Sequence, residues 1–387
     1  MPIVDTEPLF KDERSLRRAH VALSYLTHLY VHSATHDPSS PISIPPSLSI
    51  PLIKVSRELG VPPVITYADT VLWNWRKIDP SLPTTADNLC AVTNMSGTPD
   101  EDHFYMTSAR IELRGVEALS LMRATLDETF LGDKLAIRRI CTYLTRLAVV
   151  IDDISALLAS VRKGCDPVVF YNQFRPWISG GTAHPAGWKF EGAELSIEEQ
   201  EQFAKLSGPS AAQCSLIHAM DIFLGVEHVP HASHPHSHSH PPSTSEAAKP
   251  KKKPSSPASP AFRSSASSGT FLQIQQLYMP RHHRTFLSYL HTIQHTVRSH
   301  VLAHQDQPKL KEAYNGAVEA LKKFRDEHLR IAAFYIISQA RRKVSSTEMI
   351  AITGEGEKEG SRGSGGTLLV PFLKSARDDT SCTVIHA

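Results

Sequence analysis

The chain has 387 residues, of which 41% are hydrophobic, enough for about two domains with their own cores. Lys and Arg (41) nearly balance Asp and Glu (39), so the formal charge of +2 predicts neither nucleic-acid binding nor attraction to an acidic membrane. No apolar run reaches the ~20 residues that cross a bilayer, and the five cysteines form no C-x-x-C pair, which favours a cytoplasmic protein that binds a small molecule.

The predicted elements are helices along almost the whole chain, so the sequence predicts an all-α fold. Helical spacing of apolar residues covers 11–32, and the Pro-rich stretch at 42–51 is expected to end any helix before a short one over 50–60. Further helices are predicted at 64–78, 104–129, 134–162, 196–205, 212–226, 270–278, 281–304, 308–343 and 367–379. No segment shows a convincing alternation typical of strands.

Residues 230–269 differ in composition from the rest, because they are almost free of aliphatic side chains. Such a segment buries too little apolar surface to offset chain entropy, so it is predicted to be a disordered insertion. Its histidines at 231–240 have a pattern that can chelate a metal, and KPKKKP at 249–254 resembles a nuclear-import signal. Both patterns are more typical of a solvated polar linker.

His328 lies on the apolar face of the helix predicted over 308–343. Residues that recur every three or four positions form this face: Tyr314, Ala317, Leu321, Phe324, His328, Ile331 and Tyr335. An inward imidazole of this kind is either a buried side chain hydrogen-bonded to a neighbour or an axial haem ligand. The pattern alone does not choose between these two interpretations.

A second group of histidines occupies the helix predicted over 281–304. His291 with His295, and His300 with His304, have the i, i+4 spacing that places two imidazoles on one helix face for zinc. No glutamate stands in the H-E-x-x-H position, and no third ligand is apparent. A solvated polar face is therefore the favoured interpretation over a zinc protein.

Seven separate stretches together resemble the indoleamine 2,3-dioxygenase family of haem proteins. They are VPPVITYADTVLWNW (61–75), HFYMTSARIELRG (103–115), FYNQFRPWISGG (170–181), SGPSAAQCSLIHAMDIFLGVEH (207–228), YMPRHHRTFL (278–287), FRDEHLRI (324–331) and GSGGTLLVPFLKSARDDT (363–380). The resemblance runs from about residue 17 to 380, interrupted by the insertion. It implies a small helical N-terminal domain, here shortened to residues 1–63, and a large haem-binding catalytic domain formed by 64–229 and 270–387.

The activity that the resemblance implies is opening of the indole ring of L-tryptophan, or a related indoleamine, by O₂. The product is N-formylkynurenine, in the kynurenine pathway of tryptophan catabolism that feeds NAD biosynthesis. One haem b per chain, ferrous in the active form, is the implied cofactor, and the protein is expected to be a cytoplasmic monomer with neither nucleic-acid nor membrane partners.

By motif, the resemblance makes His328 the axial ligand of the haem iron. Asp221 matches an acid near that imidazole, and Arg325 matches an arginine near the haem. Taken alone, these two residues favour a helix-surface or buried ion pair. Ser210 and Ala211 match residues that line the distal side of the haem.

The same resemblance assigns the substrate pocket. Tyr67, Phe104 and Phe170 would enclose the indole, with Tyr171 and Val71 adding to the wall. The two residues implied in catalysis are Ser108, whose hydroxyl lies near substrate and O₂, and Arg175, whose planar fork suits the substrate carboxylate. Ser364 and Gly365 would lie in a loop that closes over that carboxylate. Taken alone, the aromatic residues are typical of the core of a helical protein. Without the resemblance, Arg175 would be interpreted as a surface charge, and the Gly-rich loop as a linker.

Two of three departures from the family pattern support an alternative hypothesis. The N-terminal domain is expected to be shortened, and Pro209 and Cys214 replace a small residue and a serine. The third departure, Ser364 where threonine is usual, keeps the hydroxyl. The alternative is a shortened paralogue that binds haem or tryptophan as a sensor or partner-binding protein with little turnover.

Overall fold

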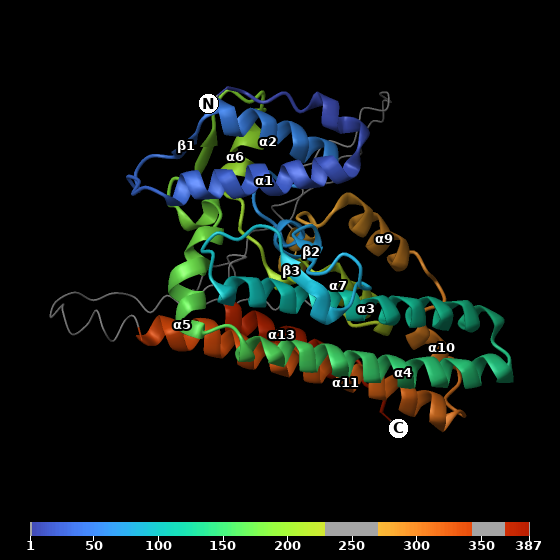
Figure 1. Cartoon of the computed structure of the whole chain (residues 1–387). Helices are drawn as coiled ribbons and strands as arrows, with labels where there is room; N and C mark the ends of the chain where they lie inside the picture. The colour runs from blue at the N-terminus through green and yellow to red at the C-terminus, as the bar shows by residue number, and fades with distance from the viewer. Residues whose placement is uncertain (1, 229–269, 343–367, 387) are drawn as a thin grey trace, which may run out of the picture.

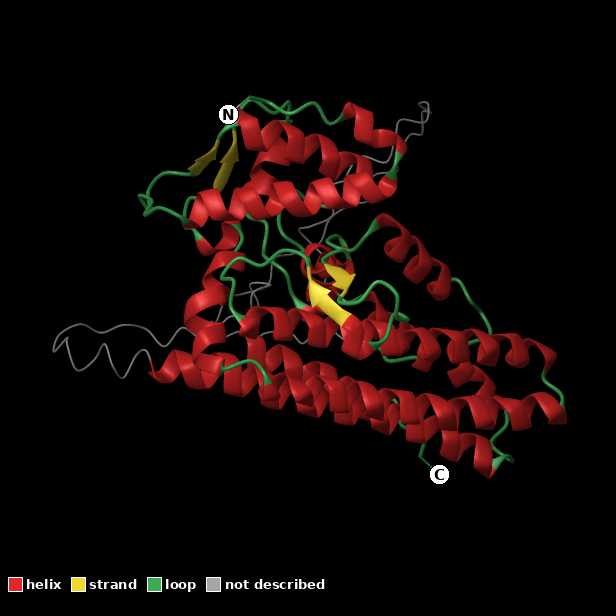
Figure 2. Cartoon of the chain, in the orientation of Figure 1, coloured by secondary structure: helices red, strands yellow, loops and turns green. Residues whose placement is uncertain are grey.

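The computed structural model describes residues 2–228, 270–342 and 368–386 of the chain. Helices dominate this part, as Figure 2 shows, which confirms the predicted all-α class. The predicted insertion at 230–269, and the two loop residues Ser364 and Gly365, lie outside the described residues. Among the helices that are described, none has both the length and the apolar character needed to cross a membrane.

Three long helices form the lower layer of the molecule in Figure 1: α3 (Pro99–Leu131), α4 (Lys134–Ala159) and α11 (Pro308–Ala332). The C-terminal helix α13 (Leu369–Cys382) packs along α11. Capping side chains fix the first residues of α3 and α4. The Thr98 side chain accepts from the Glu101 N–H, and the Asp133 side chain accepts from the Leu135 and Ala136 N–H groups. The larger hydrophobic core lies between these helices.

A smaller unit lies above this layer and contains η1 (Glu7–Lys11), α1 (Glu13–His32) and α2 (Pro46–Leu59). Strand β1 (Ile42–Ile44) pairs in parallel with β4 (Trp188–Phe190), with Ile42 opposite Trp188. Helix α6 (Ile197–Ala204) packs on β4. The smaller hydrophobic core therefore joins residues 16–64 to residues 188–206, whereas the predicted division at residue 63 stays a prediction.

The remaining described elements are short. They are η2 (Ala68–Leu72), β2 (Trp75–Lys77), η3 (Ala86–Asn88), β3 (Leu89–Ala91), η4 (Ser160–Lys163), α5 (Pro167–Val169), η5 (Phe170–Phe174), η6 (Arg175–Ile178), η7 (Gly181–Ala183), η8 (Ala211–Gln213), α7 (Ser215–Leu224), α8 (Phe271–Gln276), α9 (Arg281–His291), α10 (Val297–Ala303) and η9 (Ala333–Ile337). Several of them carry the residues implied in the pocket.

Three helix predictions were wrong in detail. The segment 64–78 is a single π-helical turn, η2, followed by β2, which pairs antiparallel with β3. The predicted helix 281–304 is interrupted between α9 and α10, because Thr296 caps a new helix by accepting from the Ser299 N–H. Helix α2 begins at Pro46, inside the stretch expected to end helices, because a proline in the first turn needs no N–H partner.

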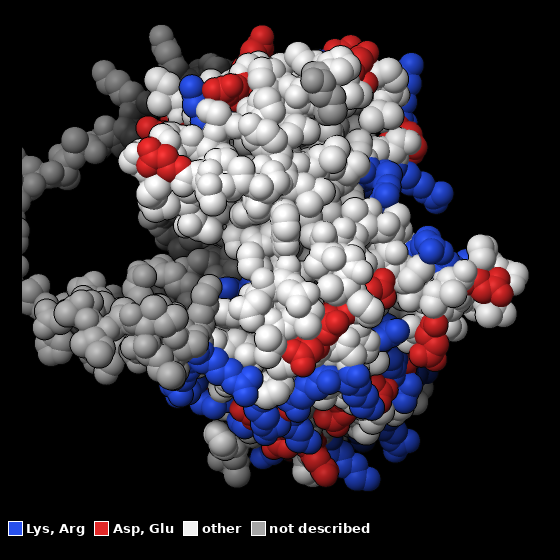
Figure 3. Space-filling view, turned by 60° about the vertical axis from the view of Figure 1, so that its left-hand side comes forward, with Lys and Arg blue, Asp and Glu red and all other residues white. Residues whose placement is uncertain are grey.

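Charged side chains of both signs cover the lower part of the face shown in Figure 3. Lys and Arg interleave there with Asp and Glu over the long helices. On this face no region of a single sign stands out, in keeping with the near-zero formal charge of the whole chain.

Candidate active site

Two neighbouring cavities share the side chains of Tyr67, Ser108 and Ala211. The large cavity spans about 850 Å³ and the small cavity about 560 Å³, counting the space at their mouths that is open to solvent. Helices α3, α7, α11 and α13 supply most of the large cavity, while η2, α3 and the segment around Arg175 supply most of the small one.

His328 projects from α11 into the large cavity, beside the ring of Phe324, which lies 6.5 Å away between ring centroids. Burial, and then the nearby Arg325 guanidinium, lower the pKa of His328 to about 4, so its imidazole is neutral at physiological pH. The other described residues offer its ring nitrogens no hydrogen bond. The first interpretation from sequence, a buried imidazole satisfied by a neighbour, therefore finds no support in this part of the chain.

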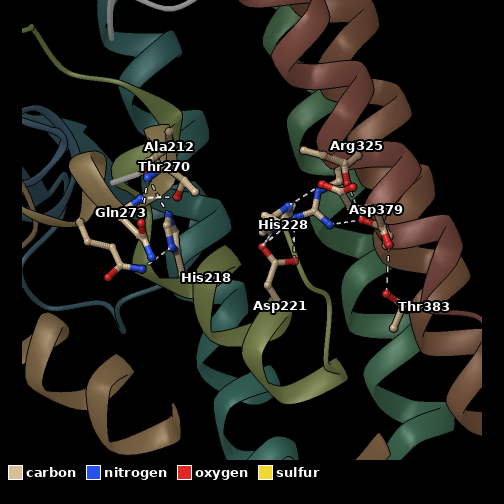
Figure 4. A network of polar contacts seen from close by, with 12 residues as sticks. Ala212, His218, Asp221, His228, Thr270, Gln273, Arg325, Asp379 and Thr383 are labelled. Carbon is tan, nitrogen blue, oxygen red and sulfur yellow. Dashed lines mark hydrogen bonds and ion pairs between the residues drawn. The ribbon is translucent and has the colours of Figure 1, made fainter. Parts of the chain in front are cut away.

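Asp221 and Arg325 form a buried ion pair across the large cavity wall, with Asp221 oxygens 2.6 and 2.7 Å from Arg325 Nη2. His228 Nε2 donates to Asp221 Oδ2 over 3.1 Å, and His228 Nδ1 donates to Asp379 Oδ2 over 3.1 Å (Figure 4). Burial acts to raise the pKa of Asp221, but the positive neighbours outweigh it and lower that pKa. Asp221 shares the cavity with His328, while its hydrogen bonds go to Arg325 and His228.

The small cavity has aromatic walls, and Arg175 is the cation among the described residues that line it. Phe104 and Phe170 lie 5.0 Å apart between ring centroids, and Tyr67 and Val71 add to the wall. Arg175 reaches the cavity at the start of η6, and its Cζ stacks 5.2 Å from the ring centroid of Tyr171. Burial lowers the pKa of Arg175, although a guanidinium remains charged.

Most residues assigned to the pocket by resemblance thus lie together, and their individual roles stay predictions. Ser108 and Ala211 line both cavities, and Ser210 lines the small one. Tyr171 contacts Arg175 without lining either cavity. The positions of Ser364 and Gly365 fall in the undescribed range.

Glu112 is a functional candidate that sequence reasoning missed. It lies one helical turn after Ser108 on α3, and its Oε1 accepts from the Tyr67 hydroxyl at 2.9 Å and from the Cys214 thiol at 3.0 Å. Burial raises the pKa of Glu112, and the two donors only partly offset this. The i, i+4 spacing from Phe104 and Ser108 was the available signal, because it places Glu112 on the face that carries the pocket residues.

The four histidines considered for zinc do not converge. His291 ends α9, His295 lies in the connection, and His300 and His304 lie in and just after α10. Across residues 2–228, 270–342 and 368–386, no group of three or more His, Cys, Asp or Glu side chains is placed to hold a metal ion.

Comparison with known proteins extends over nearly the whole chain. The family model for indoleamine 2,3-dioxygenase matches residues 1–383. The chain is 32% identical to indoleamine 2,3-dioxygenase of Saccharomyces cerevisiae, over 97% of this chain and 80% of the yeast protein. It is 30% identical to human indoleamine 2,3-dioxygenase 2, over 100% of this chain and 83% of the human protein. A further relative, 6-hydroxytryptophan 2,3-dioxygenase of Fusarium equiseti, is 27% identical over 98% of this chain and 82% of its own length.

The extent of these matches confirms the resemblance noted in the sequence, including its fungal members. The helical architecture agrees with it. The chain belongs to the indoleamine 2,3-dioxygenase family and is a dioxygenase.

Proposed function

We propose that the chain binds one haem b in the large cavity and uses O₂ to open the indole ring of L-tryptophan, giving N-formylkynurenine. The names of its relatives support an indole amino acid as the substrate class. The observation that carries the proposal is that two neighbouring cavities share a wall, one presenting a neutral imidazole and the other presenting aromatic walls and an arginine. As part of the same proposal, the enzyme works as a cytoplasmic monomer in tryptophan catabolism.

The residues of the large cavity fit a haem. His328 offers a neutral nitrogen with no competing partner among the described residues, which is the state that ligates iron. The Asp221–Arg325 pair keeps a guanidinium at the cavity wall, where it suits an acidic group of the porphyrin. When bound in its ferrous form, the haem supplies the site for O₂ activation.

The small cavity fits the substrate. Phe104 and Phe170 provide flat apolar surface for an indole, and Arg175 provides a planar pair of donors for the α-carboxylate. Ser108 lies on the wall common to both cavities, so its hydroxyl is available where substrate and O₂ meet. The protein therefore contributes enclosure, orientation and an anion clamp.

Reconstitution of the purified chain with hemin tests the cofactor. We expect a Soret band, ferrous and carbon monoxide spectra typical of an imidazole-ligated haem, and loss of stable haem retention in His328→Ala. His300→Ala, at a buried histidine of α10 outside both cavities, is the matched control and should retain haem. A chain that stays colourless with hemin contradicts the cofactor assignment.

Addition of O₂ and L-tryptophan to the reduced protein tests the reaction. N-formylkynurenine, followed by its near-ultraviolet absorbance, is the expected product. An intact haem spectrum without product would instead favour the sensor or partner-binding alternative.

A further inference from the structure

Helix α1 of the small unit carries two histidines that contact the segment following Arg175. The Trp177 carbonyl accepts from His28 Nδ1 over 3.0 Å, and the Ser179 carbonyl accepts from His32 Nε2 over 2.8 Å. Trp188, itself 1% exposed, packs edge-on against His28 with ring centroids 5.1 Å apart. The segment with Arg175 is thus fixed to the small unit by imidazoles that lie outside both cavities.

His28 also contacts a second pocket segment. The Ile65 N–H donates to His28 Nε2 over 3.2 Å, two residues before Tyr67. Because Nε2 accepts and Nδ1 donates, the ring must be the neutral Nδ1–H tautomer. Burial, followed by the nearby His32, lowers the pKa of His28 to about 3, so this state persists across the physiological range.

Gln213 connects the Tyr67 segment to residues 208–213, which contribute Ser210 and Ala211 to the cavities. Gln213 Oε1 accepts from the Tyr67 N–H over 2.8 Å, and Gln213 Nε2 donates to the Gly208 carbonyl over 3.0 Å. Ser210 and Ala211 lie between these contacts in sequence. The backbone at Tyr67 is therefore held through the Ile65 N–H by His28 and through the Tyr67 N–H by Gln213.

We propose that His28 is a positioning residue for the substrate cavity, because its single imidazole sets the separation between the Tyr67 and Arg175 segments. The inference rests on the proposed function, since it concerns how well the aromatic wall and the carboxylate clamp engage L-tryptophan together. His28 touches neither cavity, so its effect passes through the backbone at Ile65 and Trp177.

The test compares His28→Leu, which removes both hydrogen bonds, with His28→Gln, whose amide can still donate and accept. We expect His28→Leu to raise KM for L-tryptophan by about tenfold or more while kcat changes less, because a misplaced clamp weakens substrate binding. His28→Gln should recover most of this loss. His32→Leu, which removes the hydrogen bond to the Ser179 carbonyl and leaves both His28 hydrogen bonds in place, should give a smaller increase in KM.

Leu52→Ala is the matched control, because Leu52 is fully buried in the smaller core and lies away from both cavities. It should lower the melting temperature and leave KM unchanged. Hydrogen exchange gives a readout independent of turnover, since the Ile65 amide should exchange faster in His28→Leu than in Leu52→Ala.

Two outcomes overturn the inference. One is an unchanged KM in His28→Leu together with a loss of stability like that of Leu52→Ala, which would make His28 a purely structural residue. The other is a wild-type chain that neither binds nor converts L-tryptophan, which refutes the proposed function and the positioning role with it. If His28→Leu does not fold, an unchanged KM in His32→Leu counts against the inference in the same way.

Discussion

Arg175 stacks over Tyr171 and lines the small cavity. Arg175→Lys would keep the positive charge and lose the planar fork, so we expect KM for L-tryptophan to rise by about tenfold, the effect of about 1.4 kcal/mol. The haem spectrum should not change. Steady-state kinetics checks this, with Arg146→Lys on the exposed face of α4 as the control that leaves KM unaltered.

Cys214 is expected to be chemically inert despite lining the large cavity. Burial and the neighbouring Glu112 raise the pKa of its thiol well above the usual value, and only 4% of the residue is exposed. Brief alkylation of the native chain followed by mass spectrometry should label the exposed Cys382 and spare Cys214. Equal labelling of both cysteines would show that the cavity opens readily to solvent.

Residue types and spacing predicted much of the candidate site, whereas pairings between distant residues could not be predicted. His328 was found because it interrupts an apolar face. The Tyr67–Gln213 contact spans 146 residues of sequence, and the His28–Trp177 contact spans 149. Nothing local in one sequence specifies such partners, because they follow from how helices pack.

At the scale of elements, His228 links α7 to α13 through two carboxylates, those of Asp221 and Asp379, with Arg325 of α11 also nearby. Burial acts to lower the pKa of His228, but the carboxylates outweigh it and raise that pKa. Because the pKa of His228 is higher in the folded chain, its two ion pairs stabilise the fold fully below the pKa of a histidine in the unfolded chain, about 6.5. That stabilisation is lost as the pH rises through the pKa of His228 in the folded chain.

The prediction is therefore that His228→Gln lowers the melting temperature most at about pH 5.5, and that the difference from wild type shrinks towards about pH 9. Calorimetry over this range measures it. A difference that instead grows with pH would mean that His228 contributes as a neutral donor.

The chain segments around Gly180 and Gly208 run in direct backbone contact. A Cβ added at Gly208 would lie 2.0 Å from the Ile178 carbonyl oxygen. Gly208→Ala should therefore cost about 1–3 kcal/mol of unfolding free energy and raise KM, because the two segments carry Arg175 and Ser210. Denaturant unfolding tests this, and Gly316→Ala, where the structure leaves open space within α11, should be neutral or slightly stabilising.

Long helices were predictable because their apolar residues follow the helical period, as in α4 and α11. In the segment 64–78, Val64, Ala68 and Val71 recur at helical spacing and are all buried, although only the single turn η2 is helical. Helical spacing alone therefore does not distinguish a helix from a short, irregular buried segment. The break between α9 and α10 contains no Gly or Pro, and only the Thr296 cap marks it. Strands of three residues are too short for their alternation to be seen.

At the scale of the whole molecule, a ligand that binds only the folded chain raises its stability by mass action. We expect hemin to raise the melting temperature of the wild-type chain, by an amount equivalent to about 2.7 kcal/mol when free hemin is 100-fold above Kd. His328→Ala should show little of this increase. The comparison needs no turnover, so it separates haem binding from catalysis, and an equal increase in both proteins would place the axial ligand elsewhere.

Strand β1 cannot pair with β4 until well into the synthesis of the chain. Ile42 pairs with Trp188, so the first strand leaves the ribosome long before its partner exists. At about 5–20 residues per second, the delay is roughly 7–30 s. Throughout that interval the nascent N-terminal helices carry unburied apolar side chains, and we expect them to depend on chaperones until the later strand emerges.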